Sequence, residues 1–123
     1  MRPEFKDGQA QRIGFQIDTM LIDPSGISAS IYARNILDIS PDSLAHVART
    51  AKKIAVAGMK AFNADGITLQ QFSEHAGGQV VFHLHVHVMP RVEGVALLPP
   101  ASRKEDVKVL EDHATRLIAA LSS

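Results

Sequence analysis

The segment from His83 to His87 alternates imidazole and apolar side chains with a strict period of two, between apolar residues at 80–82 and 88–89. His83, His85 and His87 occupy every second position, and apolar residues stand between them. In an extended strand successive side chains point to opposite faces, so the imidazoles share one face and the apolar residues share the other. An ordinary strand does not need a row of groups that titrate near neutral pH. The pattern therefore predicts a strand whose apolar face joins a core and whose histidine face carries chemistry.

Composition limits what kind of protein this is. A chain of 123 residues fits one domain with a real core. Its 13 basic and 13 acidic residues balance, so we expect neither a nucleic acid nor a membrane as partner. The absence of cysteine excludes disulfides and thiolate metal sites. With no apolar run suited to a signal peptide or a bilayer span, we expect a cytoplasmic protein.

A long helix is predicted from Pro41 to Phe62. Ser40 and Pro41 form a helix start, with a hydroxyl at the N-cap and proline at the first helical position. Apolar residues then recur at helical spacing along one stripe. The turn residues 63–66 end the helix.

Strands and a second helix are predicted around this long helix. We expect a hairpin from strands at 12–22 and 27–32, and a second hairpin that joins a strand at 67–72 to the histidine strand. Residues 102–105, Ser-Arg-Lys-Glu, have the pattern of a capping box for a last helix. The order hairpin, helix, hairpin, helix predicts an α+β fold, with two main helices on an antiparallel sheet.

The histidine row suits attack on phosphorus. A central imidazole can present a nucleophilic nitrogen while its neighbours orient it, and closely spaced imidazoles oppose one another's protonation. Gly77 and Gly78 allow a backbone to approach an anion closely, and Gln79 adds an amide donor on the histidine face. The alternative for the same histidines is a zinc site built on two of them, with a further ligand from Glu74, His75 or an aspartate.

The span from Gly77 to Arg91 closely resembles the signature of the histidine-triad (HIT) family. That signature is His-φ-His-φ-His-φ-φ, where φ is apolar, usually preceded by Gly-Gln and often followed by Pro-Arg. The resemblance implies a nucleotide hydrolase or nucleotidyl transferase that needs neither metal nor cofactor. It also implies a purine nucleotide or nucleotide conjugate as ligand, and a homodimer formed by joining two sheets.

The resemblance also assigns roles to residues. His85 matches the nucleophile, which forms a nucleotidyl-histidine intermediate, and His83 and His87 match the supporting histidines. Gln79 matches the phosphate-side amide, and the backbone at Gly78 and Val80 is expected to hold phosphate oxygens. The remaining candidates for ligand contact are Gln71, Ser73, His75 and Arg91.

Two positions depart from the family pattern. Phe72 stands seven residues before Gln79, where many members have Asn or Gln, and Gln71 or Ser73 is the expected substitute. Val80 stands where many members have Ser or Thr, so it offers only its backbone N–H.

The resemblance covers the chain from Ala33 to about Ala120. We therefore expect a single domain, in which residues 1–32 are a divergent N-terminal segment and residues 33–123 are the HIT-like catalytic part. The expected activity is a metal-independent phosphoramidase or nucleotidyl hydrolase acting on the α-phosphate of a purine nucleotide conjugate. Two alternatives stay open: a nucleotide-binding protein with little catalysis, because the N-terminal pocket is altered, and a metal-dependent hydrolase that uses a His-x-His pair.

Overall fold

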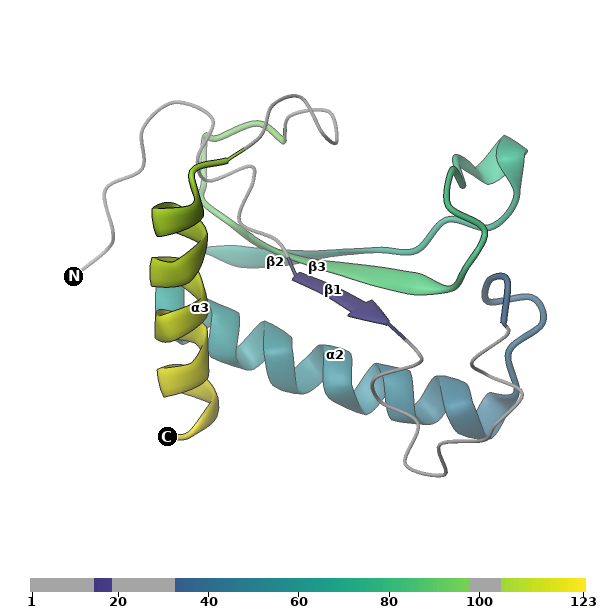
Figure 1. The fold of residues 1–123 in the computed structure, drawn as a ribbon, viewed down its shortest axis with the longest axis horizontal. Coiled ribbons are helices and arrows are strands. Elements are labelled where there is room, and N and C mark those ends of the chain that lie inside the picture. The colour runs from purple at the N-terminus through teal and green to yellow at the C-terminus, as the bar shows by residue number, and fades with distance from the viewer. Residues whose placement is uncertain (1–14, 19–32, 98–104) are drawn as a thin grey trace. The chain divides into compact units, whose positions relative to one another are not determined.

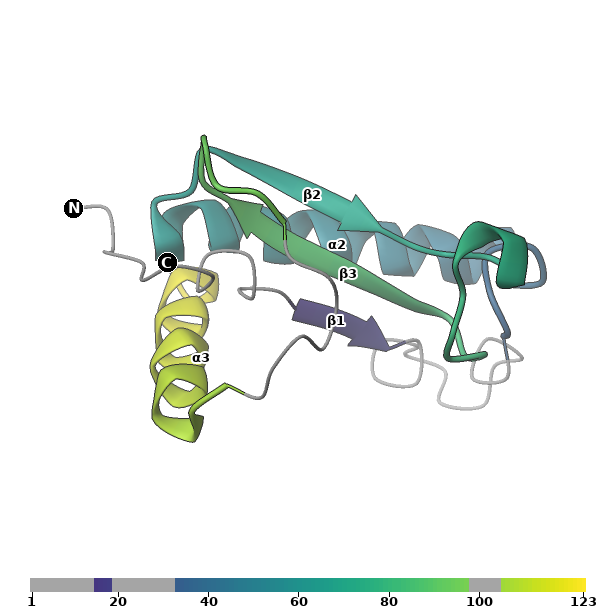
Figure 2. The same cartoon turned by 90° about the horizontal axis from the view of Figure 1, so that it is seen from above.

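The computed structural model describes residues 15–18, 33–97 and 105–123. A three-stranded sheet has the order β1-β3-β2, and two α-helices accompany it (Figures 1 and 2). The elements in chain order are β1 (Phe15–Asp18), α2 (Pro41–Phe62), β2 (Gly66–Gln70), the 3₁₀ helix η3 (His75–Gly77), β3 (His85–Arg91) and α3 (Val107–Leu121). This combination of helices and sheet confirms the predicted α+β fold.

The central strand of the sheet is β3, which carries two of the three histidines. It pairs with β1 in antiparallel register, from Phe15 opposite Val88 to Asp18 opposite His85. β2 lies on the other side of β3 and runs in the opposite direction (Figure 2). β1 falls within the strand predicted at 12–22, whereas its predicted hairpin partner at 27–32 lies outside the described residues.

β3 begins five residues later than the pattern predicts, so the prediction of a strand from Val80 was wrong at its start. Residues 81–83 bend instead of continuing the strand. The N–H of Leu84 donates to the carbonyl of Ala33 at 2.9 Å, and the carbonyl of Val81 accepts from the Gln79 side chain at 3.1 Å. The first bond ties the bend to a distant segment of the chain, which no local pattern reveals, and the second bond holds the bend from within.

Two other strand ends also differ from prediction. β3 continues to Arg91, whose carbonyl accepts from the N–H of Asp65 at 2.8 Å, although Pro90 within it has no N–H to donate. β2 ends at Gln70 instead of Phe72, because Gln71 turns its side-chain amide back onto the Phe72 carbonyl at 2.7 Å. The loop toward the histidines therefore starts earlier.

The prediction for α2 is confirmed at both ends. At its start the Ser40 hydroxyl accepts from the N–H of Ser43 at 3.1 Å, as expected of an N-cap residue. Val47, in the first half of α2, packs with Leu84 in a buried cluster. The other buried members are Ala33 and Ile39, with Leu44 and Val86 packed against them.

The second half of α2 approaches Pro90 closely at Gly58. A methyl group added at Gly58 would lie 3.1 Å from Cγ of Pro90, so glycine permits this contact. Phe62, near the end of α2, is fully buried and meets the edge of the His113 ring at a centroid distance of 5.2 Å. Burial lowers the pKa of His113, and this effect exceeds that of the neighbouring Asp112 carboxylate, which raises it.

The predicted start of the last helix was wrong. α3 begins at Val107, and its N-cap is Asp106, whose carboxylate accepts from the N–H of Lys108 at 2.8 Å. Glu105 and Asp106 are not helical, so Glu105 cannot complete a capping box from Ser102. Ser102 itself lies outside the described residues.

The chain divides into two compact units that alternate along the sequence. Among described residues, one unit contains 53–68, 89–97 and 105–123. The other, called the histidine unit here, contains 15–18, 33–52 and 69–88. The boundary predicted after residue 32 falls among residues outside the described ones. Within the described part of the chain, no helix combines the length and apolar character needed to cross a bilayer.

Candidate active site

The side chain of His85 is held by the backbone of His83. Its Nδ1 lies 2.7 Å from the His83 carbonyl oxygen. A carbonyl oxygen can only accept, so Nδ1 carries a proton, and in the neutral imidazole Nε2 then keeps the lone pair. This is the tautomer that a nucleophilic imidazole needs when Nε2 is the attacking atom.

His87 follows His85 on the same face of β3, and their rings meet edge to face. The centroids are 5.0 Å apart and the ring planes are at 87°. Burial lowers the pKa of the His87 imidazole, and the positive charge that His85 can carry lowers it further. Both causes favour a neutral His87 near pH 7.

His83 lies in the bend before β3, so the structure does not place all three histidines on one strand. It presents its backbone carbonyl to His85, and its side chain is partly buried. The apolar face agrees with the prediction, because Val88 in β3 and Leu84 directly before β3 are buried in the core. The alternation thus sets the faces correctly even though the strand begins late.

Gln79 is buried, with only 3% of its surface exposed, and its amide makes four hydrogen bonds. Its oxygen accepts from the side chain of Asn35 at 3.0 Å and from the N–H of Glu74 at 2.8 Å. Its nitrogen donates to the carbonyls of Arg34 at 2.8 Å and Val81 at 3.1 Å. Both N–H groups are therefore used inside the protein, which leaves none for the predicted contact with phosphate.

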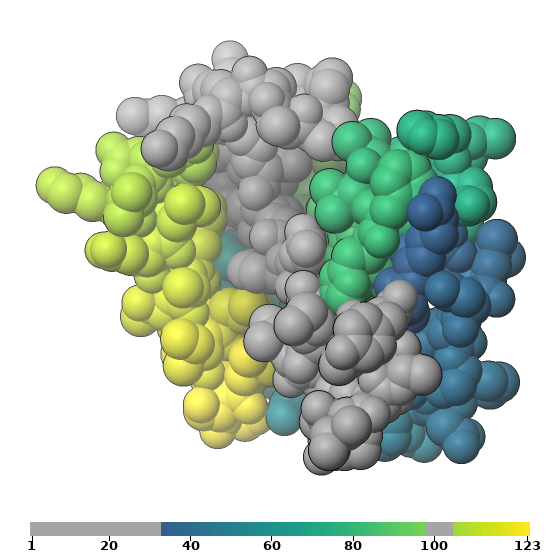
Figure 3. Space-filling model, turned by 45° about the vertical axis from the view of Figure 1, so that its right-hand side comes forward, coloured from purple at the N-terminus to yellow at the C-terminus, as the bar shows by residue number. Residues whose placement is uncertain are grey.

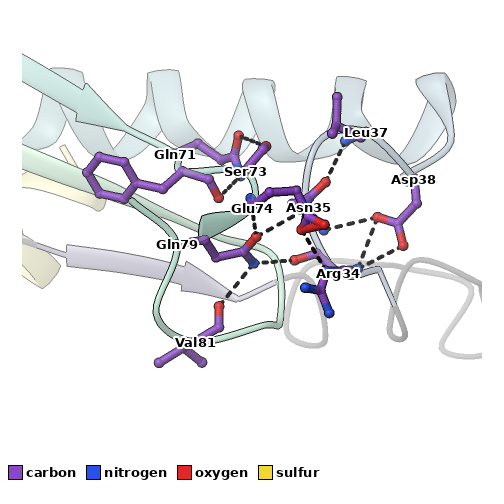
Figure 4. Close-up of polar contacts among 10 residues, drawn as sticks. Arg34, Asn35, Leu37, Asp38, Gln71, Ser73, Glu74, Gln79 and Val81 are labelled. Carbon is purple, nitrogen blue, oxygen red and sulfur yellow. Dashed lines mark hydrogen bonds and ion pairs between the residues drawn. The ribbon is translucent and has the colours of Figure 1, made fainter. Parts of the chain in front are cut away.

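The partners of Gln79 come from two segments that are far apart in sequence (Figure 4). Asn35 is 2% exposed and donates through Nδ2 to both the Gln79 oxygen and, at 2.9 Å, Glu74 Oε2. The same Glu74 oxygen accepts from Arg34 Nε at 2.7 Å. In Figure 3 the blue surface of the segment that begins at residue 33 lies against the green surface of the 74–84 loop.

The turn that carries Asn35 is itself fixed by Asp38. The Asp38 carboxylate accepts from the backbone N–H groups of Arg34 and Asn35, each at 3.0 Å. These two bonds, that from Asn35 first, lower the pKa of Asp38. Sequence reasoning missed Asn35 and Glu74, because nothing in the local pattern signals a bond between residues about 40 positions apart.

The glycine turn lies exposed beside this network. Gly78 has a positive φ of 92°, which favours glycine, and the ring of Phe72 stands 3.4 Å from where a Cβ would be. Glu74 also has a positive φ, 66°, a strained conformation that its bonds to Gln79 and Asn35 help to hold. Val80 is 84% exposed, so its side chain takes no part in the core.

The remaining predicted contact residues lie in two places. Gln71 and Ser73 bond to each other in the loop, through the serine hydroxyl and the Gln71 oxygen at 3.1 Å. His75 is exposed and meets the edge of the Phe82 ring at 5.0 Å. Arg91 belongs to the other unit, where it donates to the Thr68 hydroxyl at 3.1 Å and the Val95 carbonyl at 3.2 Å.

The zinc alternative named His75 and Glu74 as further ligands. Glu74 Oε2 already accepts from Arg34 and Asn35. Among residues 33–97 and 105–123, no group of three or more histidine, aspartate and glutamate side chains is arranged to hold a metal ion.

Comparison with known proteins shows which family the sequence and the fold match. The model of the HIT domain matches residues 30–94. A solved structure of a HIT-like protein involved in cell-cycle regulation, from Bartonella henselae, superposes with a TM-score of 0.66 at 45% identity, over 71% of this chain and 62% of that chain.

Two curated relatives match over shorter spans. An uncharacterized HIT-like protein of Saccharolobus solfataricus is 41% identical over 46% of this chain and 40% of the relative. An adenylylsulfatase of Arabidopsis thaliana is 30% identical over 66% of this chain and 41% of that protein. The chain therefore spans less than half the length of these two relatives.

Proposed function

Because the chain belongs to the HIT-domain family, we propose that it is a nucleotide phosphoramidase or nucleotidyl hydrolase that acts at the α-phosphate of a purine nucleotide conjugate. The activity is assigned to residues 33–123. The single observation that carries the proposal is the bond between Nδ1 of His85 and the carbonyl of His83. That bond leaves Nε2 of His85 with the lone pair that attack on phosphorus requires.

The reaction proceeds in two displacements. Nε2 of His85 attacks the α-phosphorus, an N–P bond forms, and the bond from phosphorus to the leaving group breaks. An N–H of His87 donates a proton to the leaving amine or oxygen as it departs. Water then attacks phosphorus, the N–P bond breaks, and a proton from the water returns to His87 as the nucleoside monophosphate leaves. No step requires a metal ion or a cofactor.

Phosphate oxygens need donors in this reaction. Both N–H groups of the Gln79 amide are used internally, and the backbone N–H groups of Gly78 and Gln79 donate to the carbonyls of His75 and Glu74, each at 3.0 Å. Within this stretch the donor is therefore assigned to the backbone N–H of Val80. The exposure of Gly78 and Val80 leaves this stretch accessible to a ligand. The adenylylsulfatase relative supports an adenylyl group on the substrate side.

Replacement of the nucleophile tests the proposal. His85→Asn should lower kcat for an adenosine phosphoramidate by about a thousandfold or more, because the attacking lone pair is lost. His46→Asn is the matched control, since His46 is an exposed histidine on α2, and it should keep full activity. Turnover of His85→Asn at the wild-type rate would refute the assignment.

A nucleotide-binding protein with little catalysis is the second candidate, and one observation favours it. The ring of Phe72 packs beside Gly78, at the sequence position where many family members have an amide side chain. The site thus has one polar group fewer for phosphate than the family pattern provides. Tight binding of a purine monophosphate by calorimetry, together with absent turnover of every conjugate tried, would select this candidate.

A further inference from the structure

A buried polar network joins the segment at 33–38 to the loop that leads into β3. Its centre is Asn35, which is 2% exposed. Every polar atom of the Asn35 side chain is used: Nδ2 donates to Glu74 Oε2 and Gln79 Oε1, and Oδ1 accepts from the N–H of Leu37 at 2.9 Å. A buried amide that is fully satisfied in this way has one preferred orientation.

The network continues from Asn35 to the backbone that holds His85. Gln79, oriented by Asn35, donates to the carbonyl of Val81. One residue beyond His83, the N–H of Leu84 donates to the carbonyl of Ala33. The His83 carbonyl lies between these two fixed points, and it is the oxygen that accepts from Nδ1 of His85.

A second set of contacts fixes the same bend from outside. The Arg34 guanidinium stacks over the Phe82 ring, with 4.0 Å from Cζ to the ring centroid, while its Nε pairs with Glu74. Phe82 is the residue directly before His83. The bend is therefore held at Phe82 and Leu84 by Arg34 and Ala33, which lie within two residues of Asn35, and at Val81 by Gln79.

We infer that Asn35 is a positioning residue for the nucleophile, acting through Gln79 and the backbone of residues 81–84 to keep the His83 carbonyl where it fixes the tautomer of His85. The kinetic part of this inference rests on the proposed function. The part that concerns the tautomer does not, because it is a property of the free protein.

The central test is Asn35→Asp, which keeps the shape of the side chain but removes its N–H donors. The new carboxylate faces Oε2 of Glu74 and Oε1 of Gln79, two groups that can only accept. In ¹⁵N NMR of the imidazoles, wild-type His85 should be a single Nδ1–H tautomer, and Asn35→Asp should give a mixture of both. With an adenosine phosphoramidate, kcat should fall roughly 10- to 100-fold while KM changes little.

Rescue separates positioning from loss of fold. In Asn35→Asp with Glu74→Gln, the new amide at 74 can donate to the carboxylate at 35, so the single tautomer and part of kcat should return. Asn63→Asp is the matched control, because Asn63 is exposed in the other unit, and it should leave both readouts unchanged. Glu74→Gln alone changes an exposed side chain and should shift the tautomer ratio less, in the same direction.

The outcomes are distinct. A single Nδ1–H tautomer in both Asn35→Asp and Glu74→Gln would overturn the inference, and so would an unfolded Asn35→Asp accompanied by an unchanged tautomer in Glu74→Gln. If wild-type protein turns over no nucleotide conjugate, the proposed function fails while the NMR comparison still decides the role of Asn35.

Discussion

At the scale of single residues, the candidate site depends on which nitrogen of an imidazole carries the proton. The bond from His85 Nδ1 to a backbone carbonyl settles this for the free protein. His87 stays neutral for another reason, namely burial beside a second imidazole.

The pKa of His87 gives a residue-scale prediction. In an NMR titration the wild-type His87 midpoint should lie below its ordinary value of 6.5. His85→Asn should raise it only in part, because burial, the larger cause, remains. A midpoint at or above 6.5 in wild type would contradict the burial argument.

The same shift has a consequence for stability. Since the folded pKa of His87 is lowered, its contribution to stability is fully present above the unfolded pKa of about 6.5 and is lost as pH falls through the folded pKa. Acid should therefore destabilise the wild-type protein partly through this residue.

At the scale of elements, two apolar residues of the histidine segment differ in burial. Leu84 is 1% exposed and belongs to the buried cluster with Val47. Val80, in the apolar run that precedes His83, is 84% exposed. An apolar residue in this segment is therefore buried only where the fold brings it against the core, as the Ala33–Leu84 bond does for Leu84.

Truncation at these two positions tests that difference. Leu84→Ala should lower the free energy of unfolding by about 2 to 5 kcal/mol, because it removes buried methyl groups and leaves a cavity. Val80→Ala should change it by less than about 0.5 kcal/mol. Urea unfolding of both variants measures the two effects, and equal losses would contradict the difference in burial between Leu84 and Val80.

At the scale of the whole molecule, the homodimer that the family resemblance implies requires a sheet edge that is free to pair with a second copy. β2 is at one edge of the described sheet, and Leu69 within it is 53% exposed. An exposed apolar residue on an edge strand favours pairing with a second strand. We propose that two copies join their sheets through β2.

Sedimentation tests the dimer. Wild-type protein should sediment at twice the chain mass of 13.3 kDa, and Leu69→Lys should shift it toward monomer because a charge at the joined edge opposes pairing. Ile118→Lys is the control, since Ile118 is a similarly exposed residue on α3. A dimer that survives Leu69→Lys unchanged would place the contact elsewhere.

Much of the fold follows from local patterns in the sequence. The extent of α2 was predicted at both ends, because a capped start, an apolar stripe and a terminal turn are all encoded within it. The face of β3 that joins the core was also predicted, because side-chain alternation fixes faces wherever the chain is extended. His85 was predicted as the nucleophile from the sequence alone, because it is the central one of the three histidines.

The tertiary structure alone decided where β3 begins, which strand pairs with it and what Gln79 does. The start of β3 and the role of Gln79 depend on bonds between the segment at 33–38 and the loop at 74–84, and a local pattern has no information about partners some 40 positions away. The strands that pair with β3 likewise come from other parts of the chain. The sequence by itself therefore determined the chemical identity of the histidine face. Only the folded chain determined that the buried Gln79 amide holds the loop through four hydrogen bonds and that Asn35 donates to the Gln79 oxygen. Burial and the pairing of polar groups are properties of the assembled core.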